Sequence, residues 1–248
     1  MRVYSLQPYI PGSNFEEPTL LRTLKPHTTP VLVIAVDKTS TLFATGAADG
    51  VTKVWDIRGG YVTHTFRGPN VLIGALHFFE LSAESRHEET GISARNRKNR
   101  KKKADSDDED EREGDESVRG FRLASGAQDG KIRIWDLFTR KCASVLDSHV
   151  SDVRALDYSP EENALLSASR DKTIMWWDAK TWKVRKVSPV LEEVEAAGFI
   201  GDGDVSFTAG ITGNIRLWQT ATGRELTPPQ QTGSEGDAIV SAIYFKEL

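Results

Sequence analysis

Three side chains of this 248-residue sequence are candidates for bases, nucleophiles or metal ligands: His27, His149 and Cys142. Imidazole acts as a general base or metal ligand near neutral pH, and a thiolate attacks electrophiles or binds metals. His27 and His149, however, each precede a tryptophan by 28 residues, and this repeated distance indicates a structural role. Cys142 has no histidine partner indicated by the sequence and is expected to be an ordinary strand residue. We therefore predict no catalytic residue, no cofactor and no metal site.

The tryptophans that follow these histidines belong to a regular series. Trp55, Trp135, Trp177 and Trp218 are separated by 80, 42 and 41 residues. The first spacing becomes 42 when the 38 charged, low-complexity residues 82–119 are treated as an insertion. A fixed period of this length predicts a repeat architecture.

Other polar residues recur at constant distances from the tryptophans. A serine or threonine stands ten residues before each tryptophan, and an aspartate stands six residues before three of them. With the histidines, these residues form two complete sets: His27, Thr45, Asp49, Trp55, and His149, Ser167, Asp171, Trp177. Partial sets are Ser125, Asp129 and Trp135 in the second unit, and Thr208 and Trp218 in the fourth. Pro69 replaces histidine in the second unit, and Val190 and Thr212 replace histidine and aspartate in the fourth, so these two units are expected to rely more on packing.

This pattern resembles the hydrogen-bonded tetrad of WD repeats, in which a complete polar network is tolerated in the interior and sets strand register. Asp-Gly pairs between alternating runs predict hairpins. The expected fold is therefore an all-β, WD40-type β-propeller with about four complete four-stranded blades. The units cover about 20–66, 71–146, 150–187 and 194–227, and partial strands are expected at 2–6 and 239–245. Such a chain would be an incomplete arc of a seven-bladed propeller and a fragment of a longer protein.

Three stretches are more individual than a generic WD repeat: Leu20–His27, Gly59–Gly68 and Val190–Phe199. Together they resemble the transducin-beta-like, tandem-propeller subunits of the UTP-B complex of the small-subunit processome. The resemblance implies a nucleolar scaffold that works with other UTP-B WD-repeat subunits and processome proteins. It also implies pre-rRNA or U3 small nucleolar RNA as partners in the assembled particle, in support of 18S rRNA maturation. Members of that family have two propellers and a C-terminal helical region, whereas this sequence resembles only the middle and later part of the first propeller.

The insertion combines two opposite charge runs. Residues 95–103 hold seven cations, which suit nuclear import or contact with RNA phosphates. They are Arg95, Arg97, Lys98, Arg100, Lys101, Lys102 and Lys103. Nine of the twelve residues 105–116 are acidic, and Ser106 within them is a candidate phosphosite. The alternative is a solvated, disordered loop without a role of its own.

Composition restricts the remaining possibilities. The formal net charge is -4, so the overall balance points to no nucleic-acid or membrane partner. A single cysteine suits a reducing compartment, and the longest apolar runs are only strand-sized. We expect no membrane partner and no small-molecule substrate. A substrate receptor of a ubiquitin ligase and a direct RNA-binding subunit are the alternatives to a ribosome-biogenesis scaffold.

Overall fold

The structure is a computed structural model that describes residues 2–5, 18–25, 27–81, 120–226, 230–231, 238–239 and 241–242. Strands joined by turns and short loops account for this part of the chain. Among these residues there is no helix with the length and apolar character needed to cross a membrane.

Four successive antiparallel sheets, here called blades 1 to 4, make up most of the described structure. Blade 1 contains β3 (Val31–Val36), β4 (Leu42–Ala47), β5 (Val51–Asp56) and β6 (Val62–Arg67). Blade 2 contains β7 (Ile73–Glu80), β8 (Phe121–Ala127), β9 (Lys131–Asp136) and β10 (Lys141–Asp147). Blade 3 contains β11 (Val153–Ser159), β12 (Ala164–Ser169), β13 (Thr173–Asp178) and β14 (Val184–Pro189). Blade 4 contains β15 (Val194–Ile200), β16 (Val205–Gly210), β17 (Asn214–Gln219), β18 (Arg224–Glu225) and β19 (Gln230–Gln231).

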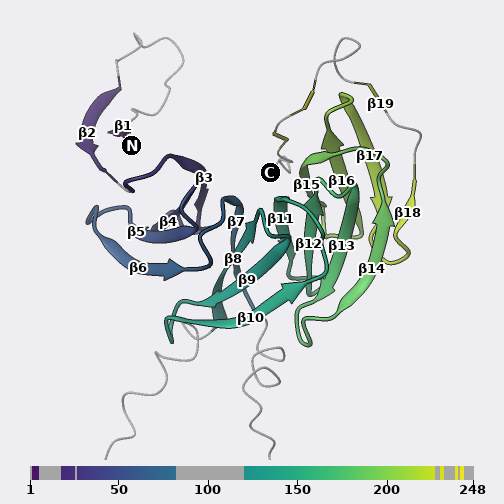
Figure 1. Cartoon of the computed structure of the whole chain (residues 1–248), viewed down its shortest axis with the longest axis horizontal. Coiled ribbons are helices and arrows are strands. Elements are labelled where there is room, and N and C mark those ends of the chain that lie inside the picture. Colours follow the sequence, from purple (N-terminus) through teal and green to yellow (C-terminus); the bar gives the residue numbers. More distant parts are fainter. Residues whose placement is uncertain are drawn as a thin grey trace, which may run out of the picture.

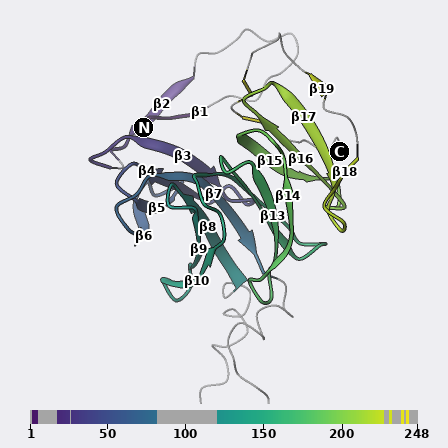
Figure 2. The same ribbon diagram turned by 45° about the vertical axis from the view of Figure 1, so that its right-hand side comes forward.

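The blades follow one another in chain order around an open arc, as Figure 1 shows. Each blade is a meander in which consecutive strands pair, and in blade 4 both β18 and β19 pair with β17. The first strands of neighbouring blades lie beside each other and line a shared hollow at the centre. Figure 2 shows the same succession of blades after a 45° turn. The predicted all-β propeller fold is therefore confirmed, with almost no helix in the described residues.

The N-terminal strands form a separate two-stranded sheet. β1 (Arg2–Ser5) pairs with β2 (Thr19–Thr23), so β2 does not join blade 1, although residues 20–23 were predicted in the first unit. Alternation predicts that a strand exists but does not identify its partner. Of the strand expected at 239–245, only residues 239, 241 and 242 are described, and the Ile239 amide donates to the Gly210 carbonyl at 2.9 Å.

The hairpin turns between second and third strands follow from local chemistry. In blades 1 to 3 an aspartate side chain accepts a hydrogen bond from the amide two residues later; in blade 1 the Val51 amide donates to Asp49 at 3.1 Å. Gly50 supplies the positive φ of 74° that this turn requires, and Lys172 adopts a φ of 67° at the matching position of blade 3. A Cβ on Gly50 would lie 2.1 Å from the Pro69 carbonyl oxygen, so the turn also packs closely on the next loop.

Apolar side chains fill the spaces between blades. One cluster joins blades 1 and 2 through Val54 and Leu123, a second joins blades 2 and 3 through Ile134 and Leu165, and a third joins blades 3 and 4. Trp176 is fully buried in the third cluster. Because each blade buries apolar surface against its neighbours, the arc is held together mainly from blade to blade.

The blades have two different ends. The tetrad end carries the loops before the first strands and the turns between second and third strands, including His149 and Asp171. The insertion end carries the connections between first and second strands. There Glu80 of β7 pairs with Phe121 of β8, and the Leu81 amide donates to the Gly120 carbonyl at 2.9 Å. Residues 82–119, with the expected disordered insertion, lie outside the described part of the chain.

Candidate functional site in the polar networks of the blades

Blade 3 contains a continuous chain of polar side chains. The Trp177 Nε1–H donates to the Ser167 hydroxyl at 2.8 Å, and this hydroxyl lies 2.8 Å from His149 Nε2. His149 Nδ1 lies 2.8 Å from the Asp171 carboxylate. A carboxylate only accepts and an indole only donates, so Nδ1–H donates to Asp171 and the Ser167 hydroxyl donates to Nε2. The structure thus brings all four residues of this set together, and both ring nitrogens are engaged.

The ionisation of this network follows from its burial. The His149 side chain is 0% exposed, and its burial lowers its pKa, although the Asp171 charge acts in the opposite direction. Burial disfavours the charged Asp171, but hydrogen bonds from Thr173 and His149 lower its pKa overall. The pair is therefore a neutral imidazole on a charged carboxylate near neutral pH.

The network of blade 1 has the same order. The Trp55 Nε1–H donates to the Thr45 hydroxyl at 3.1 Å, and this hydroxyl lies 2.9 Å from His27 Nε2. Burial, together with the charge of Lys53, lowers the His27 pKa, and the Asp49 charge opposes this change. Trp55, Thr45 and His27 therefore form a hydrogen-bonded chain, and Asp49 acts on the imidazole through its charge.

Blade 2, which lacks the histidine, has an arginine paired with the turn aspartate. The Trp135 Nε1–H donates to the Ser125 hydroxyl at 2.8 Å, as in the other blades. Arg133 Nη2 lies 2.7 Å from an Asp129 carboxylate oxygen, and a Cβ on Gly68 would lie 3.6 Å from the Arg133 Nε. The guanidinium group thus reaches the loop beside Pro69, where histidine was expected. Burial opposes the charge on Asp129, but the hydrogen bond from Arg133 lowers the Asp129 pKa overall.

Blade 4, which also lacks the histidine, contains an ion pair between an arginine and a glutamate. The Trp218 Nε1–H donates to the Thr208 hydroxyl at 2.9 Å. Arg216 Nε lies 3.2 Å from the buried Glu192 carboxylate, which also accepts from the Thr212 amide and hydroxyl. A partly buried ion pair therefore accompanies the tryptophan–hydroxyl bond in both blades, and the greater reliance of blades 2 and 4 on packing stays a prediction.

Arg133, Arg216 and Glu192 are the residues that the sequence analysis missed. Both arginines stand two residues before the tryptophan, where blades 1 and 3 have Lys53 and Met175. The available signal was that arginine occupies this position in each unit that lacks the histidine. A strand arginine two residues before the tryptophan shares its sheet face, since side chains at i and i+2 lie on one face, and it pairs with the turn carboxylate in blade 2 and with the loop carboxylate Glu192 in blade 4.

Further polar contacts cross the seams between blades. Arg154 and Arg170 of blade 3 donate to the Glu195 carboxylate of blade 4, at 2.8 and 2.7 Å. The Trp176 Nε1–H donates to the Ser206 hydroxyl of blade 4 at 3.0 Å. Asp157 on β11 accepts from the amide of Phe199 on β15 at 2.7 Å. Unlike apolar contacts, these hydrogen bonds are directional, and they fix the orientation of blade 4 relative to blade 3.

The remaining predicted site residues have different outcomes. Cys142 lies on β10, and its thiol donates to the Ser144 carbonyl at 3.3 Å. The predicted localisation or RNA contacts in 95–103 and the candidate phosphosite Ser106 lie outside the described residues. Within the described ranges, no group of three or more histidine, cysteine, aspartate or glutamate residues is arranged to hold a metal ion.

Comparison with known proteins agrees with this geometry. The family model "WD domain, G-beta repeat" matches residues 18–56, 114–136 and 140–178. Transducin beta-like protein 3 from Rattus norvegicus is 32% identical over 232 residues, which are 88% of this chain and 24% of that protein. The Homo sapiens protein of the same name is 32% identical over 224 residues, 86% of this chain and 23% of that protein. U3 small nucleolar RNA-associated protein 13 from Saccharomyces cerevisiae is 32% identical over 210 residues, 79% of this chain and 21% of that protein.

These similarities cover most of the chain but little of the relatives. The chain spans about a quarter of the length of the curated relatives it matches. The matched repeats and the four blades show that the chain carries WD40 repeats in a partial β-propeller.

Proposed function

We propose that this chain is part of a non-catalytic protein-interaction scaffold in ribosome biogenesis, acting in the UTP-B complex of the small-subunit processome. The observation that carries the proposal is the 32% identity, over 79% of the chain, to a yeast protein named for its association with U3 small nucleolar RNA. The stretches Leu20–His27 and Val190–Phe199 support it through their resemblance to UTP-B subunits. The corresponding location is the nucleolus.

The geometry of the polar networks supports a scaffold rather than an enzyme. His27 and His149, the strongest candidates for catalytic bases, are buried and face residues of their own blades. Their hydrogen bonds fix the register of the strands, so the loops and blade surfaces remain available for partners. The partners proposed are other UTP-B WD-repeat subunits and processome proteins, with pre-rRNA or U3 small nucleolar RNA in the assembled particle. No small-molecule substrate and no membrane enter this proposal.

Affinity capture of the tagged full-length protein from cells tests the proposal. We expect U3 small nucleolar RNA and UTP-B proteins to be enriched over spliceosomal RNAs and over capture from untagged cells. Depletion of the protein should lower mature 18S rRNA and leave the large-subunit rRNA unchanged. Capture dominated by cullin-ligase adaptors would instead support a ubiquitin-ligase receptor, and crosslinked RNA with few proteins would support a direct RNA-binding subunit.

A further inference from the structure

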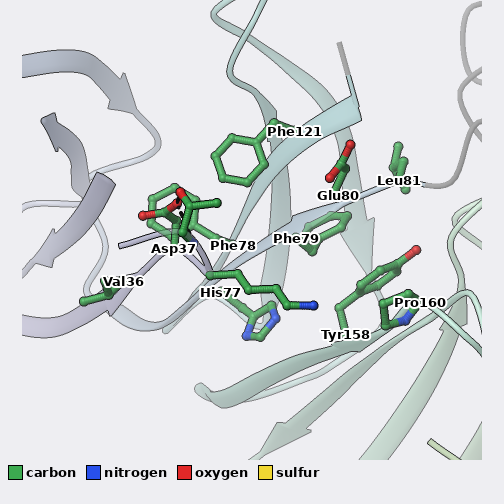
Figure 3. Close-up of a pocket in the computed structure, with 12 residues that line it drawn as sticks. Val36, Asp37, His77, Phe78, Phe79, Glu80, Leu81, Phe121, Tyr158 and Pro160 are labelled. Atoms are coloured by element: carbon green, nitrogen blue, oxygen red, sulfur yellow. Dashed lines mark hydrogen bonds between the residues drawn. The ribbon is translucent and has the colours of Figure 1, made fainter. Parts of the chain in front are cut away.

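A cavity of about 630 Å³ opens at the insertion end, where the first strands of blades 1, 2 and 3 finish (Figure 3). Its walls include Val36 at the end of β3, Phe79 on β7, Phe121 on β8 and Tyr158 on β11. Its volume lies within the roughly 300–1,000 Å³ typical of ligand sites. The cavity is separate from the polar networks, which lie at the tetrad end or within the blades.

The aromatic walls of this cavity are held in place by the blades. The Phe79 ring centre lies 4.8 Å from that of Tyr158 and 6.1 Å from that of Trp182. Phe78 stacks on Phe121 at 5.7 Å. Rings that are already fixed lose little conformational freedom when a partner binds, so the cavity favours binding without prior rearrangement.

The charges at the cavity favour a cationic partner. The Asp37 carboxylate is occupied by its own loop, since it accepts from the amides of Leu42 at 2.6 Å and Thr39 at 3.1 Å. Glu80 is exposed, and no ion pair or hydrogen bond of its side chain is found in the described part of the chain. Burial raises the pKa of Tyr158 to about 12, the charges of Glu161 and Glu80 act in the same direction, and the charge of Arg185 acts against them.

Lys38 also lines the cavity, and it is the one cation among the lining residues. Its ammonium group sits on a flexible four-carbon stem and can turn toward solvent or toward a carboxylate. The two lining carboxylates, Asp37 and Glu80, therefore outnumber it beside the aromatic walls.

We propose that this cavity binds a peptide segment of a partner protein, in which an apolar side chain enters between the aromatic walls and an adjacent lysine or arginine pairs with Glu80. The inference rests on the proposed scaffold function and names the surface and the partner chemistry. Apolar anchors in preformed pockets with charged neighbours are a common basis of peptide recognition. RNA is disfavoured at this position because its phosphates would meet the two carboxylates.

Peptide binding to the full chain tests the inference. The probe is a short fluorescein-labelled peptide with paired arginine and phenylalanine residues, and binding is followed by fluorescence anisotropy. Val36→Trp introduces a large side chain at a position that is 56% exposed, and Glu80→Lys reverses the rim charge. Each change should weaken binding about tenfold or more.

Matched controls separate the cavity from general effects. Val145→Trp changes a 51% exposed valine on the outer strand β10, and Asp204→Lys reverses an exposed charge in the β15–β16 turn. Both should bind the peptide like the unmodified chain. A companion peptide with glutamate in place of arginine, one with serine in place of phenylalanine, and an oligouridine RNA should bind much more weakly. Equal binding by Val36→Trp and Val145→Trp, or tighter binding of the glutamate peptide or of the RNA, would overturn the inference.

Capture from cells distinguishes failure of this inference from failure of the proposed function. If the full-length protein still captures U3 small nucleolar RNA but neither cavity change weakens peptide binding, the inference about the cavity is refuted and the proposed scaffold function stands. Unmodified protein that captures no U3 small nucleolar RNA would refute the scaffold whatever the peptide results.

Discussion

The strand hydroxyl is the most regular residue of the four networks. In every blade it accepts a hydrogen bond from the tryptophan ten residues later, at 2.8 to 3.1 Å. The hydroxyls are Thr45, Ser125, Ser167 and Thr208. A buried indole N–H needs an acceptor, and a hydroxyl that accepts can still donate onward. This pair therefore forms the common part of the network, and the residue beyond it varies.

Replacement of Asp171 by alanine should destabilise the chain by roughly 1–3 kcal/mol, because the buried His149 imidazole loses its acceptor, as do the Thr173 hydroxyl and the Val150 amide. Asp147→Ala is the control, since its ion pair with Lys131 at 2.7 Å is exposed and is worth roughly 0–1 kcal/mol. The measurement is the urea denaturation midpoint of both variants. Similar midpoints would show that the buried carboxylate contributes no more than a surface charge.

The sequence predicted the residues that repeat and missed those that substitute for them. Ser167 and Asp171 are recognisable because their types and offsets recur, and the network needs a hydroxyl and a carboxylate at those places. The residue two positions before the tryptophan is lysine, arginine or methionine, so no single residue type recurs there. Arg133 and Arg216 become recognisable only when the missing histidine is considered together with the charge that must replace it.

At the scale of strands and turns, the hairpins were more predictable than their assignment to blades. The runs around Asp49-Gly50 became β4 and β5. Turn chemistry and alternation act within a few residues, so they can be read locally. The pairing of β2 with β1 depends on residues far apart in the sequence and was not predicted.

A bulge recurs at one position in all four blades. The register between the first and second strands shifts two residues into each first strand, for example between Val31 and Val33 and between Val153 and Ala155. Bulges increase local twist and redirect side chains. Nothing in the residue types marks this feature, because the first strands begin with ordinary apolar alternation.

Deletion of residues 82–119, with a short glycine-containing turn in their place, should leave the melting temperature unchanged or slightly raised. The ends of the deleted segment already meet in a paired hairpin, and closure of the long loop costs only about 1–3 kcal/mol. Differential scanning fluorimetry of the two chains provides the measurement.

The same deletion tests the basic run. If residues 95–103 contribute to import or RNA contact, a full-length protein lacking them should show reduced nucleolar accumulation or RNA crosslinking at an unchanged melting temperature. Retention of both properties would leave the insertion without a role of its own, and a large fall in melting temperature would show that it supports blade 2.

For the molecule as a whole, histidine burial should make stability depend on pH. Burial lowers the pKa of His27, His64, His77 and His149 below the unfolded value near 6.5. Between these values the unfolded chain binds more protons, so stability is full above about pH 6.5 and falls as the pH decreases toward the folded pKa values.

Urea midpoints measured from pH 7.5 to pH 5 should therefore decrease. The lowered pKa values of Asp171 and Glu195 predict a second decrease near pH 4, where carboxylates of the unfolded chain take up protons. His149→Asn should lower the midpoint at pH 7.5 and reduce its dependence on pH above pH 5. A midpoint that stays constant down to pH 5 would contradict the neutral, buried state of the histidines.

The contrast between β2 and β12 determines the order in which the chain opens. Every residue of β2 is exposed, whereas every residue of β12 is buried. Proteins open in sub-global steps whose free energy rises with burial, and a repeat gains stability from each neighbour it touches. Blade 3 has neighbours on both sides and a complete network, while the N-terminal sheet has neither advantage. Fluctuations therefore begin at the N-terminal sheet and reach blade 3 last, so the amides of β12 are the slowest to exchange with solvent and report the global unfolding of the arc.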